Sequence, residues 1–267
     1  MFDPAGLPAE LSRTDDSLGA RFEDAGLTCS QPPQQTIYDG WLLRYSPGKA
    51  KRARSVNAIA AGVRPLDEKL AHVEAFYGRV GLPCVFRITP YTRPPAMDAA
   101  LAARGFLAQE ESRVMWTELQ RASGRATQVG RFTTLSGPEF ADLVARLRGS
   151  PPTQAAAERQ RIAHLVLPAL YIAVQVGDQP VASGCVVIDD DVAGIFNMVT
   201  TPTQRGQGHA TAIVEHLLRH ASAAGARWAY LQVDAANVAA RCVYRKFGFR
   251  DRYAYWYRAR PPQGELQ

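Results

Sequence analysis

A glycine-containing loop between a predicted strand and a predicted helix is the segment of this 267-residue chain most suited to binding a ligand. It reads Arg205-Gly206-Gln207-Gly208, and the helix should begin directly after it. Glycines let the backbone approach a ligand closely. The first N–H groups of a helix lack partners within the helix and, with the helix dipole, attract anions. The pattern therefore predicts a phosphate or pyrophosphate site, although two glycines alone are also typical of an ordinary tight turn.

Two common nucleotide-binding motifs do not fit this loop. A P-loop needs Gly-Lys followed by Ser or Thr, and no such run follows Gly208. The third glycine of the dinucleotide fingerprint G-x-G-x-x-G is replaced by Thr211, and the loop comes late in a mostly antiparallel order of strands. A nicotinamide- or flavin-dependent oxidoreductase is therefore disfavoured.

A second motif follows about thirty residues later. Asn237, Ala240, Tyr244, Gly248 and Phe249 have the spacing N-x-x-A-x-x-x-Y-x-x-x-G-F. Residues four and seven apart share a helix face, so the first three should lie together. Asn237 is suited to cap the helix, and a tyrosine hydroxyl with a pKa near ~10 can act as an acid. Taken alone, a tyrosine at such a position more often has a structural, partly buried role.

Hydrophobic periodicity and turn residues predict the elements that carry these motifs. In the second half, Ser136 and Glu139 have the spacing of a capping box, which predicts a helix running to about Arg148. The other predicted helices there are 155–165, 209–224 and 237–247, and the predicted strands are 131–135, 171–176, 180–188, 192–200, 228–233 and 253–259.

The first half ends on a similar strand–helix–strand sequence, which is compatible with a duplicated domain and equally with two unrelated halves. Phe106 and Phe249 each follow a glycine, and Trp116 and Trp256 follow in the same order. The expected organisation is an N-terminal arm at the periphery (1–34), a first domain (35–120), a linker (121–129) and a second domain (130–267). The first domain should contain strands 37–45, 55–63, 83–89 and 112–119 and helices 65–77 and 97–106.

Together, the run Q-R-G-Q-G-H-A (204–210) and the Asn237 motif resemble the GNAT superfamily of acetyl-CoA-dependent N-acetyltransferases. The resemblance covers residues 130–260 in that family's order of elements, and Arg205, Gly208 and Ala210 match the spacing of its pyrophosphate loop. The segments DGWLLR (39–44) and RSVN (54–57) resemble the leading domain of an uncharacterised bacterial group with a degenerate first half. The resemblance implies an α/β protein of the α+β type, with two GNAT-like halves, each a mixed, mostly antiparallel twisted sheet flanked by helices.

The resemblance also implies a mechanism in which acetyl-CoA is the cosubstrate and no metal takes part. Strand 197–200 would splay from strand 231–233, so that its backbone pairs with the pantetheine arm and polarises the thioester carbonyl. Tyr244 would protonate the leaving thiolate, and a primary amine of an unidentified small molecule would attack directly. The implied cofactor-binding residues are Met198, Val199, Thr200, Gln204, Arg205, Gly206, Gln207, Gly208, His209, Ala210 and Asn237.

No general base is assigned from the sequence. The family often carries a glutamate on the strand before the loop, but VAGIFNMV has no carboxylate. Residues 189–191 are three aspartates that fit a hairpin turn, Asp234 fits a helix cap, and a water relay is equally compatible. His209, His216 and His220 share one helix face without a nearby carboxylate ligand, so we expect a solvated or interface face and no metal.

Composition leaves further alternatives open. The net charge of +6, from 31 Lys and Arg against 25 Asp and Glu, favours an acidic partner. The basic segment 48–54 could bind nucleic acid or the CoA 3′-phosphate, but it fits a solvated turn better, and nucleic acid is disfavoured because no aromatic residue interleaves it. A non-catalytic acyl-CoA-binding regulator is the main alternative to an enzyme. Four distant cysteines and the lack of a signal-like or membrane-spanning apolar run favour a cytoplasmic protein without a membrane partner. We expect this protein to be a monomer or a homodimer.

Overall fold

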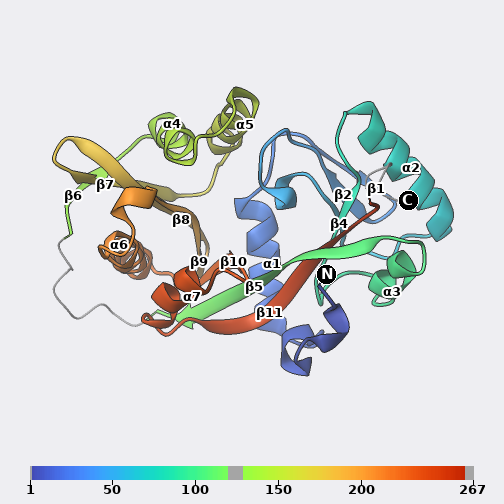
Figure 1. Ribbon diagram of the computed structural model, residues 1–267. Helices are drawn as coiled ribbons and strands as arrows, with labels where there is room; N and C mark the ends of the chain where they lie inside the picture. The colour runs from blue at the N-terminus through green and yellow to red at the C-terminus, as the bar shows by residue number, and fades with distance from the viewer. Residues whose placement is uncertain (1, 120–128, 262–267) are drawn as a thin grey trace.

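A single mixed sheet runs through the structure, a computed structural model that describes residues 2–119 and 129–261 (Figure 1). Its eleven strands have the order β1-β2-β3-β4-β11-β5-β10-β9-β8-β7-β6. They are β1 (Gln35–Tyr38), β2 (Trp41–Arg44), β3 (Val56–Ala58), β4 (Val85–Ile88), β5 (Leu107–Glu118), β6 (Arg131–Thr134), β7 (Ala169–Val176), β8 (Gln179–Asp189), β9 (Val192–Thr200), β10 (Trp228–Asp234) and β11 (Arg250–Ala259).

Helices flank this sheet. They are α1 (Ser17–Cys29), α2 (Leu66–Arg79), α3 (Met97–Ala102), α4 (Gly137–Arg148), α5 (Pro152–Ala163), α6 (His209–Ala223) and α7 (Val238–Arg245). The pairs β3–β4 and β9–β10 are parallel, and the other neighbouring strands are antiparallel. This confirms the expected mixed, mostly antiparallel α/β fold. No helix within the described residues is long and apolar enough to cross a membrane.

Strands from the two halves of the chain alternate at the centre of the sheet. The last strand, β11, pairs with β4 on one side and β5 on the other, so both of its neighbours come from the first half. Strand β5 in turn pairs with β10 of the second half. Figure 1 shows β5 and β11 side by side through the middle of the molecule. The sheet that carries the second half is therefore completed by the first.

Helix α1 lies in the core rather than at the periphery. Its residues Phe22, Ala25 and Cys29 are fully buried and pack in a cluster with Phe140 and Tyr230 of the second half. The expectation that residues 1–34 form a peripheral arm is therefore wrong for α1. The sequence marks this helix as amphipathic, but only the folded sheet supplies the apolar surface that its buried face covers.

A buried ion pair connects α1 to both halves. Glu23 on α1 and Arg87 on β4 are 7% and 3% exposed, and Arg87 Nη2 donates to Glu23 Oε2 at 3.0 Å. The Tyr253 hydroxyl on β11 donates to the same oxygen at 2.7 Å, and the Arg87 guanidinium lies 4.0 Å from the Tyr255 ring centroid. Three distant segments of the chain thus meet at one carboxylate.

The substitution Glu23→Gln is expected to lower the free energy of unfolding by about 3 kcal/mol. It leaves the Arg87 guanidinium buried without a counter-charge, and breaking one side of a buried pair costs about 3–5 kcal/mol. Urea denaturation of both proteins measures the difference. Asp15→Asn is the matched control, because Asp15 pairs with Arg13 at the exposed surface and should change stability little. Equal midpoints for Glu23→Gln and wild type would contradict the prediction.

Candidate active site

The start of α6 presents an open set of backbone N–H groups. The helix begins at His209, and its N-cap residue Gly208 has a φ of 86°, in the left-handed region that glycine favours. No side chain among the described residues caps this end. Gly206 is also left-handed, with a φ of 77°, and a Cβ built there would meet nothing within 4 Å. The predicted glycine loop and helix start are therefore confirmed as structure, and the geometry suits an anion.

The strand before this loop separates from its neighbour. Parallel pairing of β9 with β10 ends at Ile195 and Leu231, so the ends of the two strands diverge. On its other edge β9 carries an extra residue opposite β8, between Phe196 and Val199, and Asn197 there has a φ of 53°. Such a bulge bends its strand and redirects side chains. The expected splay of residues 197–200 from the later strand is confirmed.

A cavity of about 980 Å³ occupies the space between the diverging strands. Eleven of the twelve residues singled out from the sequence line it: Met198, Val199, Thr200, Gln204, Arg205, Gly206, Gly208, His209, Ala210, Asn237 and Tyr244. Gln207 is the exception, because its side chain is exposed and donates to the Thr203 carbonyl at 3.5 Å. Residues from two separated motifs thus meet in one hollow of the size of a ligand site.

Tyr244 reaches the cavity from α7. Asn237 caps this helix as predicted, its side-chain oxygen accepting the Ala240 N–H at 3.1 Å. Tyr244 is 7% exposed, and its ring packs against Phe249 with centroids 6.0 Å apart. Burial raises the pKa of Tyr244 to about 12, above the ~10 of a free tyrosine. The hydroxyl therefore remains protonated throughout the neutral range and is available there as a hydrogen-bond donor.

The histidine face of α6 differs from the expectation. His209 is 3% exposed, with Nε2 3.3 Å from Gln204 Oε1, so it belongs to the loop's internal structure. His216 stacks on Phe132 with centroids 4.8 Å apart, and burial lowers the pKa of His216. The predicted solvated or interface face is wrong for His209, which is buried, whereas His216 is half-buried beside Phe132 and His220 is exposed. Among the described residues, no group of His, Cys, Asp and Glu is arranged to hold a metal ion.

The aspartates weighed as bases have structural partners. Asp234 lines the cavity, but its Oδ1 accepts the Ala236 N–H at 2.8 Å at the turn into α7. Asp189 accepts from Arg21 at 3.0 Å, and Asp190, with a φ of 56°, lies in the predicted hairpin turn between β8 and β9. Both structural roles agree with the sequence analysis, and no base is assigned to either site.

Glu158 on α5 is a cavity carboxylate that the sequence analysis missed. Its Oε1 accepts from Asn197 Nδ2 at 2.7 Å and from Arg161 Nη2 at 2.6 Å, while Oε2 accepts from Arg161 Nε at 3.0 Å. Burial opposes ionisation of Glu158, but the attraction of Arg161 outweighs it and lowers the pKa to about 2. A carboxylate so well paired is a weak base. The polar Asn197 within an apolar strand was the only sequence signal pointing here.

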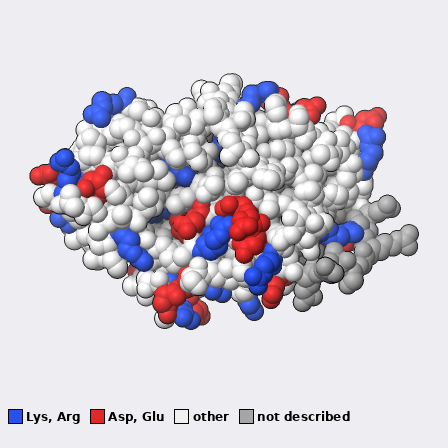
Figure 2. Space-filling view, turned by 180° about the vertical axis from the view of Figure 1, so that it is seen from behind, with Lys and Arg blue, Asp and Glu red and all other residues white. Residues whose placement is uncertain are grey.

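The basic segment 48–54 is only in part the solvated turn that was expected, since Lys49 is exposed and residues 51–54 pack against the protein. Lys51 pairs with Glu110 at 2.8 Å, Ala53 is buried, and Lys49 and Arg52 line the cavity. The face in Figure 2 has Lys and Arg beside Asp and Glu on a mostly uncharged surface. Cationic side chains also line the cavity, among them Lys49, Arg52, Arg148 and Arg161.

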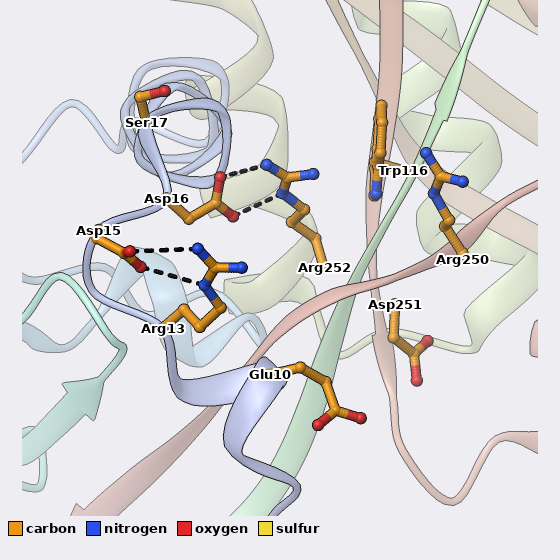
Figure 3. Close-up of a pocket in the computed structure, with 9 residues that line it drawn as sticks. All are labelled: Glu10, Arg13, Asp15, Asp16, Ser17, Trp116, Arg250, Asp251 and Arg252. Carbon is orange, nitrogen blue, oxygen red and sulfur yellow. Dashed lines mark hydrogen bonds and ion pairs between the residues drawn. The ribbon is translucent and has the colours of Figure 1, made fainter.

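A second hollow, of about 360 Å³, contains many charges (Figure 3). Arg13 pairs with Asp15 at 3.1 Å, and Arg252 pairs with Asp16. Trp116 lies between Arg250 and Arg252, whose guanidinium carbons are 4.4 and 4.9 Å from its ring centroid. Most of these charges neutralise one another, so the hollow has the character of a structural network.

The splayed parallel strands, the bulged β9 and the open helix start that faces the cavity define a GNAT-superfamily N-acetyltransferase. Residues 21–258 match the family model described as "Probable histone acetyltransferase Rv0428c C-terminal", and the chain belongs to that family. The matched region begins within α1 and includes both halves, in agreement with their shared sheet. The family makes the chain an acyltransferase of the GNAT type.

Known proteins of similar sequence and structure agree with this assignment. The chain is 28% identical over 222 residues to the "Uncharacterized N-acetyltransferase YobR" of Bacillus subtilis (strain 168), covering 82% of this chain and 89% of that protein. Its fold is similar to a GCN5-related N-acetyltransferase from Kribbella flavida (TM-score 0.65, 16% identity, 92% and 96% of the two chains). It also resembles a tandem GNAT protein from the clavulanic acid biosynthesis pathway (TM-score 0.54, 17% identity, 74% and 70%).

Proposed function

We propose that this protein transfers the acetyl group of acetyl-CoA to the primary amine of a small molecule by direct attack on the thioester. The observation that carries the proposal is the cavity between β9 and β10, which ends on the uncapped start of α6. A pyrophosphate fits the N–H groups that follow Gly208. The open space beside Gly206 leaves room for the pyrophosphate to approach the backbone of the loop.

In this proposal, the thioester lies along the free backbone of β9. Beyond Ile195, β9 no longer pairs with β10, so backbone groups of Met198, Val199 and Thr200 are available to the pantetheine arm. An N–H from this stretch would polarise the thioester carbonyl and stabilise the negative charge that develops on its oxygen. Asn197 lies at the inner end of the same stretch.

The proposed chemistry forms one bond and breaks another. The neutral amine nitrogen attacks the carbonyl carbon, the C–N bond forms, the C–S bond breaks, and the amine proton leaves to water. Tyr244 donates a hydrogen bond to the departing thiolate. Because its pKa is about 12 and that of a thiol is near ~8.5, the hydroxyl stabilises the thiolate mainly as a donor and keeps its own proton at equilibrium.

The direct test is titration calorimetry with acetyl-CoA, followed by detection of free thiol with a panel of amines. We expect acetyl-CoA binding and amine-dependent thiol release. A protein that binds no acyl-CoA would contradict the proposal. The missing carboxylate on β9 favours one alternative, a non-catalytic acyl-CoA-binding regulator, which predicts binding without thiol release with any amine.

A negative charge at the helix start should weaken acetyl-CoA binding strongly. Gly208→Asp is expected to raise the Kd about 100-fold, because a carboxylate there accepts the free N–H groups and repels the pyrophosphate. Asp tolerates the left-handed backbone that Gly208 adopts. Gly208→Asn is the matched neutral control and should raise the Kd much less. Calorimetry measures both values, and equal binding by the Asp variant and wild type would refute the anion site.

A further inference from the structure

A cluster of positive side chains surrounds the inner end of the cavity. Lys49 and Arg52 come from the first half, Arg148 from the end of α4, and Arg161 from α5, and all four line the cavity. Arg148 Nη2 donates to Asn197 Oδ1 at 3.2 Å. Arg52 lies 5.6 Å from the Phe196 ring centroid and donates to Gln232 Oε1 at 3.4 Å. The cluster thus lies where β9 and β10 begin to diverge.

Only part of this positive charge is neutralised. Glu158 lies in the cluster, but its two oxygens are occupied by Arg161 and Asn197. Within residues 2–119 and 129–261, Arg52 and Arg148 form no ion pair with a carboxylate; each donates a hydrogen bond to a neutral side-chain amide. Burial lowers the pKa of Arg148, with Glu158 opposing and Arg52 adding to the effect. Arg52 and Arg148 are therefore two guanidinium groups of the cavity with no carboxylate in direct contact, although Glu158 lies near Arg148.

The phosphates of acetyl-CoA are not suited to be that anion. The proposed pyrophosphate site begins at Gly208, beyond the end of β9, whereas the cluster surrounds Phe196 and Asn197. From Asn197 to Thr200 alone, a strand extends about 10 Å. The cluster is therefore adjacent to the expected position of the thioester, on the side from which an acceptor must approach.

We propose that the acceptor is a primary amine that also carries a carboxylate, as an amino acid does. This rests on the proposed function. Arg52 and Arg148 bind the carboxylate, for which a guanidinium fork has matching geometry, and the amine then faces the thioester near Asn197. Because like charge disfavours protonation, the same cations also help to keep the attacking amine neutral at a site without an assigned base. A polycationic acceptor would be repelled.

The test compares acceptors that differ only in the acidic group. Amino acids and their carboxamides are assayed for thiol release from acetyl-CoA, together with a polyamine and a lysine-rich peptide. For wild type we expect kcat/KM to be at least 10-fold higher for carboxylates than for the matched carboxamides. Arg52→Gln and Arg148→Gln should each raise the KM for carboxylates about 10-fold and lower the ratio of kcat/KM for carboxylates to that for the matched carboxamides about 10-fold.

Arg146→Gln is the matched control. It removes the same charge from the same helix, and both arginine side chains are exposed, but Arg146 lies outside the cavity lining. A second readout does not depend on turnover: thermal shift of the CoA-loaded protein with N-acetyl amino acids and with their carboxamides. Preference for carboxamides, polyamine or lysine-rich peptide, or equal shifts by both N-acetyl series, would overturn the acceptor proposal while acetyl-CoA binding still supports the enzyme. Absence of acetyl-CoA binding would overturn the proposed function itself.

Discussion

Residues 130–267 produced without the rest of the chain are expected to show no cooperative thermal unfolding and no acetyl-CoA binding. This fragment contains the glycine loop and Tyr244, but β11 loses both of its neighbours, β4 and β5, and β10 loses β5. The core also loses Phe22 and Trp116. Removal of one large buried side chain costs about 3–5 kcal/mol, and a whole domain is stable by only about 5–15 kcal/mol.

Co-production of residues 1–119 with residues 120–267 provides the control. If the shared sheet is the reason for the failure, the two fragments together should recover a cooperative transition and acetyl-CoA binding. Calorimetry and thermal melting measure both properties. A fragment 130–267 that folds and binds acetyl-CoA by itself would contradict the dependence on β5. Loss of acetyl-CoA binding by this fragment would therefore show that the fold needs the strands of the first half. It would not show which half contains the binding site.

Tyr244→Phe is expected to lower kcat about 100-fold and to leave the Kd for acetyl-CoA within about twofold of wild type, since a positioned acid or donor typically contributes 10²–10⁴-fold. The change removes the hydroxyl and keeps the ring that packs against Phe249. Since the pKa of Tyr244 is about 12, this hydroxyl should also cause no decline in wild-type activity between pH 8 and pH 10. Steady-state kinetics and calorimetry measure these quantities.

Tyr38→Phe is the matched control for that substitution. Tyr38 lies on β1, at the far edge of the sheet, and stacks on His72. It should leave kcat unchanged. Unchanged turnover in Tyr244→Phe would remove this residue from the mechanism, and loss of acetyl-CoA affinity instead of turnover would assign it to binding. A wild-type protein that binds acetyl-CoA and releases no thiol would support the regulatory alternative.

The local part of the site was predictable from the sequence. The glycine loop, the start of α6 at His209 and the Asn237 cap of α7 depend on neighbouring residues, and the structure confirms them. The capping box of Ser136 and Glu139 is also present as predicted. Such signals depend on residues three or four apart, so they can be recognised without knowledge of the fold.

The pairing of β11 with β4 and β5 was not predictable in the same way. Strand β5 begins at Leu107, before the predicted start at residue 112. The polar residues 109–112 hide this extension from an apolar pattern, whereas pairing with β11 makes it part of the strand. The two partners are far apart in the sequence, and nothing near either strand encodes the other. The domain boundaries at residues 120 and 130 remain a prediction. The sheet itself contains strands from both predicted domains.

The sequence by itself determined the fold class, the order of elements and the residues of the loop and of α7, because periodicity and capping are local. Tertiary structure decided what surrounds them. In the folded protein α1 packs in the core, Glu158 accepts a hydrogen bond from Asn197, and Arg52 of the first half lines a cavity formed mainly by the second half. These contacts join distant segments through packing and charge, and the character of the acceptor end of the cavity depends on them.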